Sequence, residues 1–228
     1  MFQSRLSNGD RMYLRSAFDF DASTLEEVFY NNIYEKEFTV KPGDVVLDVG
    51  AHIGSFTLKA AREVGPAGRV ISFEPSSENF GLLGRNVAAN SYANIRLYNV
   101  AVGSQPGTAR LQLHQRRGTN SLYAHSTSES VGMEDVEVRT LDSVVRELNL
   151  ARVDFMKIDV EGAELEVLKG AKEVLASFHP SIAMETHDFG PSEAELTEFL
   201  VAFGYAAKRV PYQTRLLGLL YAKQAMTS

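Results

Sequence analysis

The segment DFMKIDVEGAELE concentrates acidic side chains where an apolar run ends. Asp159 closes that run and Glu161 follows it, so both would lie at the end of a buried strand, where a carboxylate can take up the proton of a reacting group. Lys157 shares the strand face of Asp159, which leaves open either a buried ion pair or a contact with a substrate. Glu164 and Glu166 fit the first turns of a following helix, where the helix dipole stabilises negative charge.

A second segment, SIAMETHD, also ends in groups that can exchange protons. Glu185 and His187 are two residues apart and share a strand face, and histidine has the better intrinsic pKa for a base near neutrality. The sequence does not decide whether Asp159, Glu185 or His187 is the base. Asp159 and Glu185, on neighbouring strand ends, would alternatively hold Mg²⁺, because hard cations prefer oxygen ligands. The candidate catalytic residues are Asp159, Glu161, Glu185, His187 and Lys157.

The segment DVVLDVGAHIGSF indicates which ligand these groups would serve. Its spacing, Asp48-x-Gly50-x-x-x-Gly54, lacks the middle glycine of a dinucleotide-binding turn. Asp48 would repel a phosphate and suits a ligand with an ammonium group. Glu74 ends the next predicted strand, 24 residues after Gly50, where a carboxylate can accept hydrogen bonds from both ribose hydroxyls. A nucleoside that carries an amino acid is indicated, and S-adenosylmethionine is such a compound.

Apolar strands that alternate with amphipathic helices would position these residues. We expect strands at 45–50, 68–75, 94–103, 153–160 and 180–188, and helices at 55–64, 76–90, 141–149, 162–178 and 192–204. Such alternation predicts a parallel, doubly wound α/β sheet, in which ligands bind at the carboxyl ends of the strands. An antiparallel pair is expected near the end of the sequence, at 204–212 and 214–224.

Two further segments are expected to cover the edge of the sheet that holds the site. Residues 1–40 would form an N-terminal appendage, with a hairpin around Asn8-Gly9 and a helix at 21–37 over the cofactor mouth. The main domain would comprise residues 41–228. Within it, residues 107–139 interrupt the alternation with short polar, β-like pieces, and we interpret them as an excursion at the sheet edge or over its mouth.

The composition fits one soluble globular domain. The 228 residues carry a net charge of −6, which provides no general attraction to nucleic acid or anionic membranes. There is no cysteine, so thiol nucleophiles, disulfides and cysteine-ligated zinc are excluded. The N-terminus lacks the pattern of a secretory signal, and no apolar run approaches the ~18 residues of a membrane span. We expect a cytoplasmic protein that binds neither nucleic acid nor membrane, and the sequence leaves a homodimer open.

Several segments together resemble the FkbM-type methyltransferases, a family of class I S-adenosylmethionine-dependent enzymes. They are VVLDVGAHIGSFTL, ISFEPSSENFGLLGRNV, NVAVG, RTLD and KIDVEGAELEVLKGA, and the last is the most specific. The resemblance spans roughly residues 30–205. It implies a Rossmann-like, mostly parallel seven-stranded sheet with an antiparallel last strand, and O-methylation of a hydroxyl on a sugar, polyketide or related secondary metabolite. The alternatives are a metal-assisted O-methyltransferase of the catechol type and a non-catalytic S-adenosylmethionine-binding module.

The resemblance also implies site residues. The family commonly has Asn at the position of His52, so we expect at most a backbone contact there. Tyr34 and Glu35, on the N-terminal helix, would belong to the substrate pocket by resemblance. Asn120 and Ser121, in the excursion, would bind a polar acceptor because loops over strand ends carry substrate contacts. The expected cofactor-binding residues are Asp48, Gly50, Ala51, His52, Gly54, Ser55, Glu74, Pro75, Asn99 and Ala101.

Overall fold

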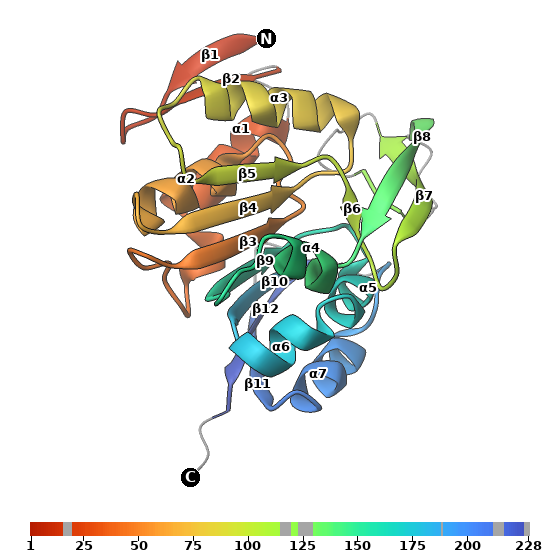
Figure 1. Cartoon of the computed structure of the whole chain (residues 1–228). Helices are drawn as coiled ribbons and strands as arrows, with labels where there is room; N and C mark the ends of the chain where they lie inside the picture. Colours follow the sequence, from red (N-terminus) through yellow and green to blue (C-terminus); the bar gives the residue numbers. More distant parts are fainter. Residues whose placement is uncertain (16–19, 115–119, 123–129, 188, 212–216, 226–228) are drawn as a thin grey trace.

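A seven-stranded, mostly parallel sheet forms the centre of the protein (Figure 1). The computed structural model describes residues 1–15, 20–114, 120–122, 130–187, 189–211 and 217–225. The strand order is β11-β12-β10-β9-β3-β4-β5, and only β12 runs antiparallel to its neighbours. The predicted fold class is therefore confirmed. The strands are β3 (Val45–Val49), β4 (Arg69–Phe73), β5 (Ile95–Tyr98), β9 (Phe155–Ile158), β10 (Ser181–His187), β11 (Tyr205–Pro211) and β12 (Leu217–Gln224).

Helices cover both faces of this sheet because its strands are apolar on both sides. One face packs against α4 (Leu141–Glu147), α5 (Glu164–Lys169), α6 (Lys172–Phe178) and α7 (Glu193–Val201). The other face, which includes Val46 and Phe155, packs against α2 (Ser55–Val64). Next to α2 lies α3 (Ser77–Ala88), whose N-cap Ser76 accepts a hydrogen bond from the backbone of Asn79. This two-sided packing holds the carboxyl ends of β3, β4, β9 and β10 in register.

Two predicted elements are interrupted in the structure. The single helix expected at 162–178 is split into α5 and α6 at Gly170 and Ala171, whose φ and ψ are not helical. A Cβ on Gly170 would lie 2.1 Å from the Gly103 carbonyl oxygen, so only glycine fits at this break. The strand expected at 94–103 ends at Tyr98. Its remainder, β6 (Ala101–Val102), leaves the central sheet and pairs with another strand. This departure opens space above the end of β4.

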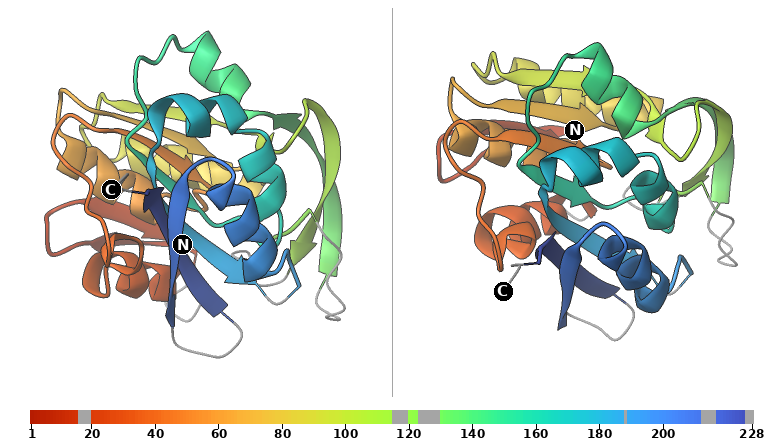
Figure 2. Two further views of the ribbon diagram at one scale, coloured as in Figure 1. Left: turned by 90° about the horizontal axis from the view of Figure 1, so that it is seen from below. Right: turned by 60° about the horizontal axis from the view of Figure 1, so that its bottom comes forward.

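The predicted excursion forms a small sheet of its own, in the order β6-β8-β7. Strand β7 (Gly107–His114) pairs antiparallel with β8 (Ser130–Arg139). Figure 2 shows these two strands, in green, standing beyond one end of the central sheet. Backbone hydrogen bonds in both directions join Gln112 to Ser121 and hold the segment 120–122 against β7.

The N-terminal appendage contains the predicted hairpin, formed by β1 (Phe2–Arg5) and β2 (Arg11–Leu14), and β2 packs on α3. The helix expected at 21–37 is shorter. It begins as α1 (Phe20–Leu25), continues as one turn of π-helix η1 (Glu26–Tyr30) and ends before Asn32, whose φ is 48°. A 3-10 turn, η2 (Ile33–Glu35), then directs Tyr34 into the core. Among the described helices, none is both long and apolar enough to cross a membrane.

Candidate active site

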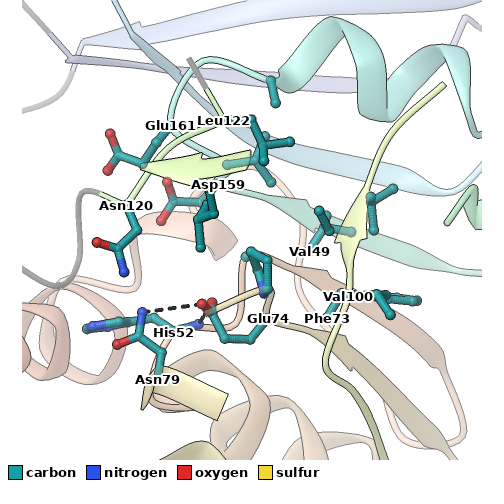
Figure 3. A pocket seen from close by; sticks show the side chains of 17 residues that line it. Val49, His52, Phe73, Glu74, Asn79, Val100, Asn120, Leu122, Asp159 and Glu161 are labelled. Atoms are coloured by element: carbon teal, nitrogen blue, oxygen red, sulfur yellow. Dashed lines mark hydrogen bonds between the residues drawn. The ribbon is translucent and has the colours of Figure 1, made fainter. Parts of the chain in front are cut away.

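A cavity lies at the carboxyl ends of the strands, between the central sheet and the small sheet (Figure 3). The space between its walls that no atom fills, open solvent included, is about 580 Å³. Its polar groups gather around Glu74 and Asp159, whereas one stretch of wall is apolar. The lining residues are Val49, Gly50, His52, Phe73, Glu74, Pro75, Asn79, Val100, Ala101, Val102, Leu111, Asn120, Leu122, Asp159, Val160, Glu161 and Ala163.

The turn after β3 forms the floor of the cavity. Gly50 has a φ of 79°, and a Cβ there would lie 1.7 Å from the carbonyl oxygen of Asp159, so only glycine fits between the two strand ends. His52 also has a positive φ, 51°. Of the residues expected around this turn to bind the cofactor, Gly50 and His52 line the cavity, whereas Ala51, Gly54 and Ser55 do not.

Glu74 is held rigidly at the end of β4. Its carboxylate accepts hydrogen bonds from the backbone N–H groups of His52 (2.8 Å) and Ser76 (3.0 Å) and from Asn79 Nδ2 (3.2 Å). The side chain is buried, and burial raises the pKa of Glu74 to about 7 despite these donors. Asn99, expected near the cofactor, lies beside the cavity and donates to the carbonyl oxygens of Glu74 and Pro75.

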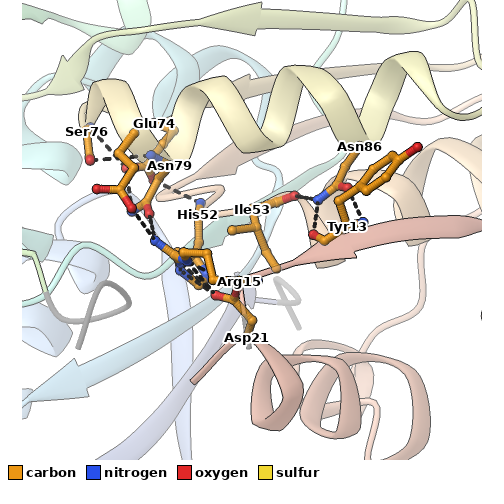
Figure 4. Close-up of polar contacts among 10 residues, drawn as sticks. Tyr13, Arg15, Asp21, His52, Ile53, Glu74, Ser76, Asn79 and Asn86 are labelled. Carbon is orange, nitrogen blue, oxygen red and sulfur yellow. Dashed lines mark hydrogen bonds and ion pairs between the residues drawn. The ribbon is translucent and has the colours of Figure 1, made fainter. Parts of the chain in front are cut away.

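A buried network ties the N-terminal hairpin to this end of the cavity (Figure 4). Arg15 forms an ion pair with the fully buried Asp21 (2.6 Å), donates to Asn79 Oδ1 (2.8 Å), and lies 2.7 Å from His52 Nε2. Burial and the charge of Arg15 lower the pKa of His52 to about 4. The imidazole is therefore neutral, and its ring contacts Arg15. Arg15, Asp21 and Asn79 gave no sequence signal as site residues.

The sequence places Asp48 against the cofactor, and the structure places it beneath the cavity. Asp48 is fully buried, accepts a hydrogen bond from Thr57 Oγ1 (2.6 Å), and lies 3.3 Å from Lys157 Nζ. Lys157 also donates to the carbonyl oxygen of Gly50. Burial alone would lower the pKa of Lys157, but the charges of Asp48 and Asp159 raise it above its usual value. Of the two roles left open for Lys157, the structure shows the buried ion pair.

Asp159 and Glu185 are joined by a buried tyrosine. The hydroxyl of Tyr34 lies 2.6 Å from Glu185 Oε1 and 3.3 Å from Asp159 Oδ2. Burial and the charge of Asp159 raise the pKa of Glu185 to about 8. The second oxygen of Asp159, Oδ1, is buried and has no hydrogen-bond partner in the described part of the chain. Glu35 was expected beside Tyr34 in the pocket; it instead faces Lys59 and the backbone of Val40, because the 3-10 turn points the two side chains apart.

His187 is buried between two glutamates. Its Nδ1 lies 3.1 Å from Glu164 Oε1, and its Nε2 lies 3.4 Å from Glu161 Oε2. Burial alone would lower the pKa of His187, but the hydrogen bond to Glu164 and the charge of Glu161 raise it to about 10. The two glutamates therefore favour the protonated form of His187 near neutrality. Glu164, interpreted from sequence only as a helix-dipole residue, is fully buried and orients this ring.

Some of these side chains are also of the types that bind metal ions. Asp159, Glu161 and His187 each offer a ligand atom, all within 4.8 Å of one another. However, both nitrogens of His187 already face carboxylates. The other pair considered from sequence, Asp159 and Glu185, has the Tyr34 hydroxyl between its carboxylates. The Asp159–Glu185 pair therefore fits an acid and hydroxyl cluster better than a divalent-cation site.

The segment 120–122 closes the cavity from the side of the small sheet. Asn120 and Leu122 line the cavity. Ser121, expected to contact a substrate, is buried and donates from Oγ to the carbonyl oxygen of Glu161 (2.5 Å). The structure thus brings Asn120, Asp159 and Glu161 together with Glu74 around one space (Figure 3), whereas Glu185 and His187 do not line it.

The sequence has clear relatives. The model of the methyltransferase FkbM domain matches residues 48–207. The chain is 30% identical over 211 residues to the 31-O-demethyl-FK506 methyltransferase FkbM of Streptomyces tacrolimicus, covering 78% of this chain and 79% of the relative. It is 29% identical over 158 residues to the 2-O-methyltransferase NoeI of Sinorhizobium fredii, covering 59% and 60% of the two chains.

Solved structures share the fold. A methyltransferase FkbM from Methylobacillus flagellatus matches with a TM-score of 0.63 and 18% identity, covering 87% of this chain and 47% of that chain. Fibrillarin from Aeropyrum pernix, solved with natively bound S-adenosyl-L-methionine, matches with a TM-score of 0.55 and 15% identity, covering 96% and 92%. At these identities the similarity shows the architecture alone.

Proposed function

The chain belongs to the FkbM methyltransferase family and is an S-adenosylmethionine-dependent methyltransferase, and from this premise we propose that it methylates a hydroxyl oxygen of a small molecule. The names of two relatives give O-methylation, at the 31-O position of FK506 in one and at a 2-O position in the other. A third relative, from Haloferax volcanii, is named a hexuronic acid methyltransferase. These names support a hydroxylated acceptor for this chain, a sugar or a similarly oxygenated metabolite.

The polarity of the cavity gives the cofactor one orientation. Glu74 stands at its middle and would accept hydrogen bonds from the ribose hydroxyls. The apolar wall beyond it, with Phe73, Val100 and Val102, suits the adenine ring. The opposite end, beside His52, would then take the methionine chain. Bound in this way, the cofactor supplies an electrophilic methyl group, and the protein has to align an acceptor oxygen and remove its proton.

We assign the removal of the acceptor's proton to Asp159. One observation carries the assignment: Asp159 Oδ1 is buried at the wall of the cavity without a hydrogen-bond partner in the described residues. The other oxygen is held near the Tyr34 hydroxyl and 3.9 Å from Lys157 Nζ, so the carboxylate has a fixed direction. His187 keeps its own proton and contacts Glu161, which lines the cavity together with Asp159.

A metal-assisted reaction is the second candidate, and the geometry favours it less. A divalent ion on Asp159 and Glu185 would have to displace the Tyr34 hydroxyl and to lie beside the Lys157 ammonium. That ammonium already balances part of the negative charge that a cation would neutralise. We therefore assign hydroxyl activation to protein groups alone.

The test is Asp159→Asn, which keeps the size of the side chain and removes its basicity. Turnover should fall by about 10²- to 10⁴-fold, the usual contribution of a general base, while affinity for S-adenosylmethionine stays as in the wild type. Asp135→Asn is the matched control, because Asp135 is 71% exposed on β8 and pairs with Arg110. Full turnover of Asp159→Asn would remove Asp159 from the chemistry.

A further inference from the structure

One polar group at the cavity has no use in the reaction described so far: the side-chain amide of Asn120. It lines the cavity, and its Nδ2 is buried without a hydrogen-bond partner in the described part of the chain. A buried amide nitrogen without an acceptor costs free energy, so its presence at a ligand cavity indicates that a ligand supplies the acceptor.

The orientation of this amide is determined by its surroundings. Asn120 Oδ1 accepts a hydrogen bond from the backbone N–H of His114 (2.9 Å), so the nitrogen is the end that faces the cavity. The neighbouring Ser121 is fixed to β7 on one side and to the carbonyl oxygen of Glu161 on the other. The side chain is thus presented from a short segment that is anchored at both sides of the cavity.

Figure 3 shows the amide nitrogen of Asn120 turned across the cavity toward His52. His52 also borders the cavity, and Arg15 lies against its Nε2. Since an arginine has only donors, Nε2 acts as the acceptor and the proton of the neutral ring is on Nδ1. This end of the cavity and the apolar wall lie on opposite sides of Glu74. The orientation proposed above puts the methionine chain at this end, beside His52.

We propose that Asn120 Nδ2 donates a hydrogen bond to the carboxylate of the methionine moiety, and so selects cofactors that carry it. The carboxylate is the one group at the amino acid end of S-adenosylmethionine that accepts a hydrogen bond well, because the ammonium has no lone pair and the positive charge of the sulfonium makes its sulfur a negligible acceptor. The inference rests on the cofactor orientation proposed above, and it reassigns Asn120 from the acceptor, where the sequence placed it, to the cofactor.

The nearby carboxyl groups do not prevent a ligand carboxylate from binding at Asn120. Glu161 Oε2 lies 3.4 Å from the protonated ring of His187, whose charge offsets that of the carboxylate. The charge of Asp159 faces Lys157. A carboxylate at Asn120 therefore meets little uncompensated negative charge.

The experiment compares ligands that differ only at this end. Affinities of the wild type, Asn120→Ala and Asn120→Asp are measured by calorimetry for S-adenosylmethionine, its decarboxylated analogue, and methylthioadenosine, which lacks the amino acid. We expect Asn120→Ala to raise the dissociation constant of S-adenosylmethionine about 10- to 100-fold, because a hydrogen bond to a charged group is lost. Asn120→Asp should raise this constant further, because its carboxylate repels the carboxylate of the ligand. Asn120→Ala should bind the other two ligands as the wild type does, and Asn120→Asp should bind them at least as tightly as the wild type, which also shows that both variants are folded.

Three results would overturn the proposal. Unchanged affinity for S-adenosylmethionine would mean that Asn120 does not touch the cofactor. An equal loss of affinity for S-adenosylmethionine and methylthioadenosine would place Asn120 at the adenosine. An equal loss of affinity for S-adenosylmethionine and its decarboxylated analogue would show that Asn120 does not bind the carboxylate. Gln112→Ala is the control for the small sheet, since the Gln112 side chain lies outside the cavity lining. The readout needs no acceptor, so it is independent of whether O-methylation is the reaction.

Discussion

Glu74 makes the affinity for the cofactor depend on pH. Burial raises the pKa of its carboxyl from 4.5 to about 7. This shift means that ionising the buried carboxyl costs about 3 kcal/mol more than ionising an exposed one. The ribose hydroxyls donate hydrogen bonds, so the bound cofactor prefers the carboxylate form. Cofactor binding should therefore lower the pKa of Glu74 and release a proton when it occurs below pH 7.

The pKa of Glu74 determines the direction and the size of the pH dependence of cofactor binding. Above about pH 7 Glu74 is already ionised and the dissociation constant is flat; below it, the constant rises as the proton competes, by at most about tenfold per pH unit. Glu74→Gln is never ionised, so its affinity should not depend on this titration. It also replaces two charge-assisted hydrogen bonds by neutral ones, a loss of about 2 kcal/mol or more, which is at least about 30-fold in the dissociation constant.

Calorimetric titration of the protein with S-adenosylmethionine, between about pH 5.5 and about pH 8.5, measures both quantities. Buffers of different ionisation enthalpy report the released proton directly. Glu198→Gln, an exposed change on α7, is the control and should behave as the wild type. A wild-type affinity that is the same at every pH, together with an unchanged Glu74→Gln affinity, would show that Glu74 is not at the ribose.

Two other predictions concern the hairpin and the metal. Arg15→Ala leaves the fully buried Asp21 without its cation and should destabilise the protein by about 3–5 kcal/mol and weaken cofactor binding, whereas Arg110→Ala, at an exposed pair, should cost less than about 1 kcal/mol. Denaturant unfolding checks this, and equal stability of the two variants would contradict it. Because the Tyr34 hydroxyl lies between Asp159 and Glu185, a chelator should leave turnover unchanged; loss of turnover that Mg²⁺ restores would refute the metal-free reaction.

The sequence was informative where the pattern is local. Alternation of apolar strands and helices predicted the sheet, and with it the strand ends that carry Glu74 and Asp159. The turn at Gly50 could be predicted for the same reason, since its glycine follows directly after a buried strand. These residues lie at the cavity because parallel strands end at one edge of a sheet.

The sequence was uninformative where a contact joins distant segments. Arg15 meets Asn79 across 64 positions, and no local pattern indicates that a hairpin arginine fixes the wall of the cavity. Glu164 looks like any acidic residue in a first helical turn until His187 is found beside it. The close packing of Gly170 on Gly103 joins segments far apart in the sequence, and the inward turn of Tyr34 depends on Asn32, whose left-handed backbone ends the helix.

Transfer of a labelled methyl group tests the central claim most directly. The protein is incubated with S-adenosylmethionine that carries carbon-13 in its methyl group, together with monosaccharides, uronic acids and hydroxylated macrolides, and the products are followed by NMR and mass spectrometry. We predict a product in which the labelled methyl is bonded to oxygen of one of these acceptors, formed about 10²- to 10⁴-fold more slowly by Asp159→Asn than by the wild type. A labelled methyl found on nitrogen, or on a protein or nucleic acid offered in parallel, would contradict the account.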